Sequence, residues 1–140
     1  MSRFVLDNTV TMAWCFTGEA TQFTETLLRR LSNLTDIAIV PALWLYEVVN
    51  VTELAVRKGR ITAEKAHAFL ESLADLPIEI ENPALPHIFV FVRALAGQYR
   101  LTAYDASYLE LAIRHNLPIA TSDKALVNAA QAAGVKLVEL

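Results

Sequence analysis

Along the whole chain, segments whose apolar residues recur at helical spacing alternate with short runs that are apolar throughout. In residues 19–34, for example, Phe23, Leu27, Leu28 and Leu31 fall on one face of a helix. Gly59 and Gly134 each follow such a segment, and glycine commonly ends helices. The pattern predicts helices over residues 9–16, 19–34, 43–58, 62–74, 87–99, 102–115 and 124–133.

The short apolar runs between these helices are typical of buried strands. They predict strands over residues 3–6, 36–40, 78–80, 118–121 and 135–138. Short apolar strands that alternate with helices favour a parallel sheet with helices on both faces. At 140 residues the chain has the length of one domain, so we expect a single α/β domain over residues 1–140.

Four carboxylates stand where predicted helices begin: Asp7, Glu47, Asp105 and Asp123. In a parallel sheet, a helix that follows a strand begins at the carboxyl edge of the sheet. A helix that leads back to the next strand begins at that edge as well. Ligands of α/β proteins bind at this edge. We therefore expect the four acids to converge on one cleft.

Clustered carboxylates repel one another unless a cation lies among them. Glu47 and Asp105 lie in apolar helices, where a carboxylate is costly without a compensating partner. A ligand set made only of oxygen atoms favours a hard cation, Mg²⁺ or Mn²⁺. The four acids therefore predict a divalent metal site.

Three neighbouring polar residues can support these acids through hydrogen bonds. Thr9 and Thr121 place hydroxyl groups beside Asp7 and Asp123, and Asn50 follows Glu47 by one helical turn. Partners of this kind orient metal-binding side chains.

Each acid also has an ordinary structural explanation when it is taken alone. Asp7 and Asp123 can cap the helices that follow them. Asp105 has the spacing of a capping box with Thr102, and Glu47 suits the positive end of the helix dipole. A non-catalytic binding module, in which the acids serve only as caps, therefore stays open.

Composition narrows the class of protein. With 54% hydrophobic and 19% charged residues, an apolar surface for a partner or a second copy is expected. Setting the four acids aside leaves 12 Lys and Arg against 11 of the 15 Asp and Glu, so charge neither favours nor excludes a phosphate-bearing substrate. A single cysteine and the lack of a signal-like or membrane-spanning run predict a cytoplasmic protein.

Several other kinds of site do not match the sequence. The residues His67, His87 and His115 lack the paired spacing of a zinc site. There is no glycine-rich phosphate loop and no G-x-S-x-G nucleophile motif. A receiver-like signalling domain needs a phosphoacceptor Asp after its third strand and a Lys after its fifth, and neither is present.

Taken in order, the four acid-bearing blocks resemble those of the PIN-domain family, and most closely the VapC-type toxins of bacterial and archaeal toxin–antitoxin pairs. The resemblance covers nearly the whole chain. The matching blocks are VLDNTVTMAW with Asp7 and Thr9, EVVNV with Glu47 and Asn50, LTAYDASYLELA with Asp105, and LPIATSDKAL with Thr121 and Asp123. Asn8 departs from the pattern, since a small residue is more usual there.

The resemblance implies a three-layer α/β/α sandwich with a five-stranded parallel sheet in the order 3-2-1-4-5. It also implies a metal-dependent endoribonuclease that forms a homodimer and is inhibited by a VapB-type antitoxin. In that reading the catalytic and metal-binding residues are Asp7, Glu47, Asp105 and Asp123, with Mg²⁺ or Mn²⁺ as the cofactor. A PIN-type nuclease that acts in RNA maturation or on DNA, without an antitoxin, is the alternative.

Contacts with the RNA substrate are predicted from position. Lys124 directly follows Asp123 and is the candidate for a phosphate contact. Arg57, Lys58 and Arg60 form the densest basic cluster, but they lie at the far end of the Glu47 helix. The aromatic residues near the acids are expected to be buried or to face a protein partner: Trp14, Phe16, Trp44 and Tyr46.

Overall fold

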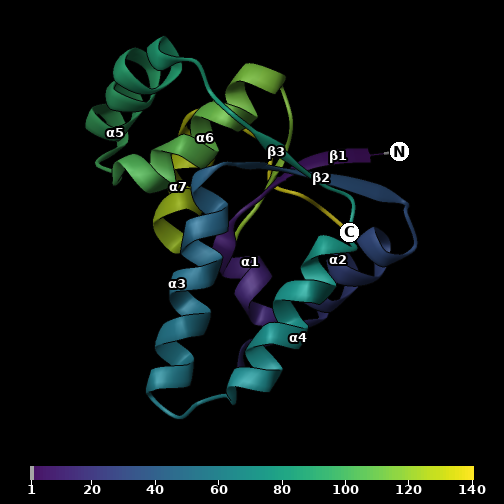
Figure 1. Cartoon of the computed structure of the whole chain (residues 1–140). Helices are drawn as coiled ribbons and strands as arrows, with labels where there is room; N and C mark the ends of the chain where they lie inside the picture. Colours follow the sequence, from purple (N-terminus) through teal and green to yellow (C-terminus); the bar gives the residue numbers. More distant parts are fainter. Residues whose placement is uncertain (1) are drawn as a thin grey trace.

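The computed structural model describes residues 2–140, and a parallel four-stranded sheet runs through its centre (Figure 1). Its strands are β1 (Ser2–Leu6), β2 (Asp36–Pro41), β3 (Ile78–Glu81) and β4 (Ile119–Ala120), in the order β3-β2-β1-β4. All three strand pairs are parallel. The predicted α/β class and the predicted order of the first four strands are confirmed.

The fifth predicted strand is reduced to a single parallel bridge between Ile119 and Leu137. Two backbone hydrogen bonds hold it: Ile119 N–H donates to the Lys136 carbonyl, and Val138 N–H donates to the Ile119 carbonyl, both at 2.9 Å. Because β4 has only two residues, it offers the C-terminal segment too few partners for a full strand. The expected count of five strands is therefore wrong, although the segment takes the expected place beyond β4.

The helices follow the predicted order, with shorter bounds at several ends. They are α1 (Asn8–Ala13), α2 (Gln22–Ser32), α3 (Leu43–Arg57), α4 (Ala63–Ala74), α5 (Arg93–Tyr99), α6 (Ala103–His115) and α7 (Lys124–Ala132), with a 3-10 turn η1 (Thr17–Glu19). The helix predicted from residue 19 begins later because Thr21 caps it: Thr24 N–H donates to the Thr21 hydroxyl at 3.1 Å. The first half of the helix predicted over residues 87–99 is π-helical, η2 (His87–Val92).

The strand order divides the helices between the two faces of the sheet. The chain runs outward from β1 through β2 to β3, and then returns across the sheet to β4. Since crossovers between parallel strands are right-handed, the outward path places α1 to α4 on one face and the return path places α5 to α7 on the other. The predicted three-layer arrangement follows (Figure 1).

The centre of the core lies between the sheet and α6. Val5, Leu6 and Val40 of the strands are completely buried. Residues 106–112 of α6 are all buried, so this helix is enclosed on every side along that stretch. A helix held so firmly is a rigid support for the side chains of its first turns.

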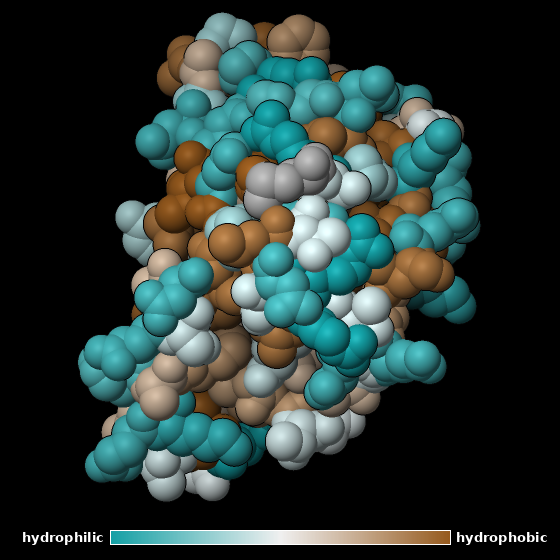
Figure 2. All heavy atoms as spheres, turned by 90° about the vertical axis from the view of Figure 1, so that its right-hand side faces the viewer, coloured by the Kyte–Doolittle hydropathy of each residue, from teal (hydrophilic) through white to brown (hydrophobic). Residues whose placement is uncertain are grey.

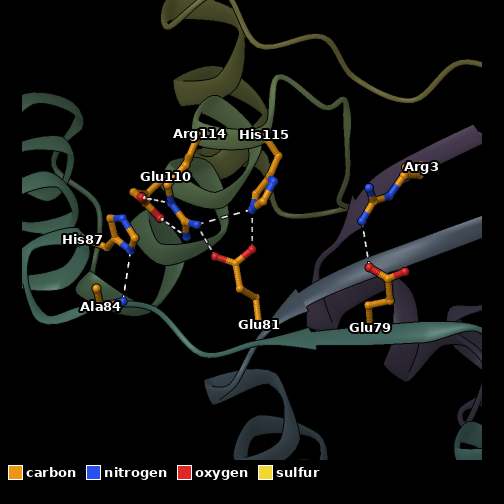
Figure 3. Close-up of polar contacts among 8 residues, drawn as sticks. All are labelled: Arg3, Glu79, Glu81, Ala84, His87, Glu110, Arg114 and His115. Atoms are coloured by element: carbon orange, nitrogen blue, oxygen red, sulfur yellow. Dashed lines mark hydrogen bonds and ion pairs between the residues drawn. The ribbon is translucent and has the colours of Figure 1, made fainter.

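An ion network ties the end of β3 to the end of α6 (Figure 3). Glu81 pairs with both Arg114 and His115. Arg114 also binds Glu110 through two hydrogen bonds, of 2.7 and 3.1 Å. The two buried or half-buried carboxylates of this network are therefore compensated by adjacent cations.

The surface mixes polar and apolar residues. Figure 2 shows this on the face next to α2, α4 and the two termini, where hydrophilic and hydrophobic residues are interspersed. Large apolar side chains elsewhere are also exposed, among them Tyr46, Phe89, Phe91 and Tyr104. Within residues 2–140, no helix combines the length and the apolar character needed to cross a membrane.

Candidate functional site

The turn after β1 places Asp7 at the point where the sheet changes direction. The connection from β1 leads to one face of the sheet and β4 is reached from the other, so the loops after these two strands diverge at the switch point of the sheet. Asp7 directly follows β1, and its N–H donates to the Ala120 carbonyl of β4 at 3.0 Å. The Asp7 side chain is buried there, at the switch point expected for a ligand.

Two threonine hydroxyl groups fix the Asp7 carboxylate. Thr9 and Thr121 each donate to its Oδ2 atom, at 2.6 and 2.7 Å. The same hydroxyl oxygens accept backbone N–H groups from the loop after β4, from Ser122 at 2.9 Å and from Asp123 at 3.0 Å. The two threonines, whose support of the acids stays a prediction, join the two loops through these hydrogen bonds.

Burial raises the pKa of Asp7 above its ordinary value, and the two threonine hydrogen bonds oppose that rise only in part. The residue after it, Asn8, carries a buried Oδ1 atom that has no hydrogen-bond partner among residues 2–140. Within residues 2–140, the buried Asp7 carboxylate thus has no paired cation, and the neighbouring Asn8 Oδ1 atom has no hydrogen-bond donor.

Glu47 reaches the site from the first turns of α3, and Tyr108 of α6 holds it. The Tyr108 hydroxyl donates to Glu47 Oε1 at 2.5 Å, and the Tyr108 side chain is completely buried. Burial and the adjacent Glu47 raise the pKa of Tyr108, so its hydroxyl stays protonated and remains a donor. Burial also raises the pKa of Glu47, as do the negative charges of Asp7 and Asp105, against the effect of the Tyr108 bond.

From the sequence we expected Asn50 to support Glu47 through a hydrogen bond. The sequence analysis did not identify Tyr108 as a partner of Glu47. In the described part of the chain, the Asn50 side chain makes no hydrogen bond to Glu47 and instead lines an open groove beside it. Glu47 is half-buried and its carboxylate is reached from α6 rather than from its own next turn. The available clue was the position of Tyr108 three residues after Asp105, on the same face of one helix.

Asp105 and Asp123 complete the group. Burial raises the pKa of Asp105 to about 6, and the negative charges of Asp123 and Asp7 add to the rise. Asp123 also caps α7, since Ala125 N–H donates to its Oδ1 at 3.3 Å. The capping interpretation is therefore correct for Asp123, and its charge nevertheless acts on Asp105.

These effects connect all four predicted acids electrostatically. The negative charges of Asp7 and Asp105 raise the pKa of Glu47. Those of Asp7 and Asp123 raise the pKa of Asp105. Within residues 2–140, none of the four forms an ion pair with Lys, Arg or His. The structure thus brings the four acids to one edge of the sheet and leaves their charge uncompensated by protein cations.

The four acids offer the type of ligand atom that suits a metal ion, but their side chains lie too far apart to hold one as they stand. The donors are carboxylate oxygens, which suit Mg²⁺ or Mn²⁺. In the part of the chain that is described, however, no three His, Cys, Asp or Glu side chains are grouped closely enough to hold an ion as they stand. Repulsion between like charges favours such spacing, and a dication is the kind of ligand that draws the carboxylates together.

The basic residues singled out in the sequence differ in whether a carboxylate of the fold pairs with them. Lys124 is exposed at the start of α7, directly after Asp123. Arg57 lies 3.4 Å from Glu53, and Arg60 lies 3.7 Å from Glu19. Arg57 and Arg60 therefore take part in ion pairs on the surface, whereas Lys124 lies next to Asp123.

An open groove continues from Glu47 along the side of α3. Its walls include Leu43, Val49, Asn50, Glu53 and two tyrosines that are largely exposed, Tyr46 at 78% and Tyr104 at 65%. The other aromatic residues singled out in the sequence are not exposed. Trp44 is buried and donates to the Thr11 hydroxyl at 3.0 Å, Phe16 is buried, and Trp14 is partly buried.

The profile of the PIN domain family matches residues 4–132. Among solved structures, the fold is similar to PAE2754 from Pyrobaculum aerophilum, with a TM-score of 0.70 and 20% identity, covering 91% of this chain and 79% of that one. It is also similar to VapBC2 from Rickettsia felis bound to a DNA fragment from its promoter, with a TM-score of 0.67 and 13% identity, covering 97% of both chains.

A third similar structure is a toxin–antitoxin complex from Klebsiella pneumoniae, with a TM-score of 0.58 and 16% identity, covering 86% of both chains. At such low identities these likenesses show the fold alone. No curated protein sequence matches the chain.

Proposed function

The chain belongs to the PIN-domain family, and on that premise we propose that it is a metal-dependent endoribonuclease, the toxin of a type II toxin–antitoxin pair of the VapC type. PIN domains are nucleases, which makes a phosphodiester the expected substrate. One observation carries the proposal: the four carboxylates interact at the switch point of the sheet, and no cation within residues 2–140 pairs with them. A group of acids with raised pKa values and no paired cation is typical of a site that binds a ligand.

The residues that would hold the metal are Asp7, Asp105 and Asp123, with Glu47 direct or through water. Bound there, Mg²⁺ or Mn²⁺ supplies a water-derived nucleophile and stabilises the charge that develops on the phosphoryl oxygens. Lys124 contacts a phosphate of the RNA from the start of α7. Its exposed position directly after Asp123 supports this role.

Three buried or half-buried hydroxyl groups keep the acids in place. Thr9 and Thr121 hold the Asp7 carboxylate in one orientation, and Tyr108 does the same for Glu47. A carboxylate that is already oriented loses less freedom when it binds an ion, so such supporting bonds raise metal affinity.

The proposed partners are a VapB-type antitoxin and a second copy of the chain. Two of the similar structures are described as VapBC2 and as a toxin–antitoxin complex, which supports an antitoxin for this chain as well. The exposed apolar side chains, including Phe89 and Phe91 of η2, support a protein partner that covers them. Since RNA and such antitoxins are found in the cytoplasm, the proposal places the protein there.

The decisive test compares two variants, Asp7→Asn and Asp105→Asn, with the wild type in a cleavage assay on single-stranded RNA with Mn²⁺. Each variant should lower the rate by more than about 100-fold, the most that the loss of a supporting residue costs. Chelation with EDTA should stop the wild type, and added Mn²⁺ should restore it. The same oligonucleotide made as DNA separates a ribonuclease from a deoxyribonuclease.

Asp75→Asn is the matched control, because Asp75 is an exposed carboxylate at the end of α4. This variant should cleave RNA like the wild type. Circular dichroism should show that all three variants are folded. Full cleavage by both Asp7→Asn and Asp105→Asn would reject the assignment.

A further inference from the structure

The two exposed tyrosines of the groove occupy equivalent positions on two different helices. Tyr46 directly precedes Glu47 in α3, and Tyr104 directly precedes Asp105 in α6. Although far apart in sequence, both rings line the same groove as Glu47. Each helix thus brings an acid to the site and an aromatic ring to the groove beside it.

Nothing within residues 2–140 holds these two rings in place. Tyr46 is 78% exposed and Tyr104 is 65% exposed, and neither hydroxyl takes part in a hydrogen bond within the described chain. Tyr108, by contrast, is completely buried and bonded to Glu47. Exposed aromatic surface of this size beside a candidate active site is typical of a binding surface.

We propose that Tyr46 and Tyr104 stack against unpaired bases of an RNA strand whose phosphate lies at the four acids. The inference rests on the proposed function, and it specifies the substrate: a single-stranded segment or a loop, with its bases turned outward. Stacking on aromatic side chains is the usual way in which proteins bind bases of single strands, and it tolerates many sequences.

The continuity of the groove with the acids favours RNA as its occupant. A strand whose phosphate reaches Glu47 can place its neighbouring nucleotides along the groove that begins there. Bases are uncharged, so they can lie beside the tyrosines while the backbone faces the metal site. Asn50 lines the same groove, and its amide offers a donor and an acceptor to a base edge.

The charges of the groove are less suited to a second copy of the chain. In a two-fold contact the same surface meets itself, which would bring the two copies of Glu47 toward each other. The other carboxylate of the groove, Glu53, is paired with Arg57 at 3.4 Å. Glu47 is therefore the carboxylate of the groove that has no paired cation within residues 2–140, and in the proposed function it binds the metal ion.

The test measures RNA binding in an Asp7→Asn background, where the RNA is not cut. Fluorescence anisotropy compares the parent with Tyr46→Ala and Tyr104→Ala on a labelled single-stranded RNA. Each alanine variant should weaken binding by about tenfold, within the range expected for the loss of one stacked base. Tyr46→Phe and Tyr104→Phe keep the ring and should bind like the parent.

Leu34→Ala is the control, because Leu34 is 60% exposed after the end of α2 and does not line the groove. It should bind RNA like the parent. An RNA with abasic sites at its centre should bind the parent no better than the intact RNA binds the alanine variants. A fully paired duplex should bind weakly and should not respond to either tyrosine.

Three results would overturn the proposal: parental affinity in both alanine variants, equal losses in the alanine and phenylalanine variants, or no RNA binding by the parent. Light scattering on the same proteins tests the second copy. If the alanine variants turn a dimer into a monomer and leave the RNA affinity unchanged, the groove is a protein interface and the proposal is wrong.

The two proposals fail in different ways. If cleavage by the wild type depends on Asp7 but not on the tyrosines, the stacking proposal is wrong and the nuclease proposal stands. If RNA binding depends on the tyrosines but the wild type does not cleave RNA, the nuclease proposal is wrong and the groove is an RNA-binding surface.

Discussion

Two groups of carboxylates in this protein differ in the partners that the fold provides, which are cations in one group and neutral hydroxyl groups in the other. At the end of β3, Glu81 and Glu110 are held by Arg114, and Glu81 also pairs with His115 (Figure 3). Burial alone would raise the pKa of Glu81, but the hydrogen bonds from Arg114 and His115 outweigh burial and lower it. This group stabilises the fold, because each charge is met by an opposite one.

At the end of β1 the acids have neutral supports instead. Threonine hydroxyls bind Asp7, and a tyrosine hydroxyl binds Glu47. Burial and mutual repulsion raise the pKa of Glu47 and of Asp105. Hydroxyl donors orient a carboxylate without cancelling its charge. The comparison teaches that the fold can compensate buried acids, and that it does not do so where β1 and β4 end.

The largest difference between the two groups is expected in their response to a divalent cation. Mn²⁺ at about 100 times its dissociation constant should raise the free energy of unfolding of the wild type by about 2.7 kcal/mol. Asp7→Asn should lose this stabilisation, whereas Arg114→Met should retain it. Thermal unfolding with and without Mn²⁺ measures both. Equal stabilisation of Asp7→Asn and the wild type would place the ion elsewhere.

Removal of the cation from the compensated group should destabilise the fold directly. Arg114→Met keeps most of the side-chain volume and leaves the buried Glu110 without its partner. We expect a loss of about 2 kcal/mol in the free energy of unfolding, less than for a fully buried pair because the Arg114 side chain is 24% exposed. Asp7→Asn should not lose stability in EDTA, since it removes a buried charge. Denaturant unfolding checks the pair, and an unchanged midpoint for Arg114→Met would contradict the comparison.

The pH dependence of stability should have opposite signs in the two groups. The folded-state pKa of Asp105 is about 6 against an ordinary 3.8, so the folded protein holds this proton more tightly than the unfolded chain does. In EDTA, stability should therefore fall as the pH rises from 3.8 to about 6. A fully buried carboxyl with this pKa would contribute about 3 kcal/mol, and solvent screening of the half-buried Asp105 leaves about 1 kcal/mol.

Glu81 has a lowered pKa, so its contribution is present above its ordinary pKa of 4.5 and is lost as the pH falls through the folded-state value. Thermal unfolding of Asp105→Asn in EDTA separates the two effects. This variant should show a smaller decrease toward pH 6, because the raised pKa values of Asp7 and Glu47 still contribute, and it should keep the loss of stability in acid. A wild-type curve without any decrease would contradict the raised pKa of Asp105.

The smallest effect is expected at a pair that belongs to neither group. Arg3 of β1 and Glu79 of β3 are joined at 2.7 Å across the intervening strand β2, and both side chains are about half exposed (Figure 3). Glu79→Gln should change the free energy of unfolding by less than about 1 kcal/mol, because water already screens the pair. The same denaturant titration measures it. A loss as large as that of Arg114→Met would mean that burial is not what separates the groups.

Local patterns were sufficient for most of the fold. Helical periodicity located the seven helices, and apolar runs located the four strands that form the sheet. They did not reveal that residues 87–92 are π-helical, because a π-helix and an α-helix place apolar residues at nearly the same spacing over one or two turns. They also overestimated the C-terminal strand, whose pairing depends on the length of a neighbour distant in sequence.

The sequence by itself determined the kinds of donor and their places: four acids at strand ends and helix starts, with two hydroxyls close by, because these positions are specified by short-range periodicity and capping. The tertiary structure decided which groups meet. Tyr108 and Glu47 lie 61 residues apart in the chain and become partners only because the fold brings the start of α3 close to α6. Tyr46 and Tyr104 likewise share a groove that no local pattern describes. Contacts of this kind depend on the relative placement of whole elements, and that placement is set by the core.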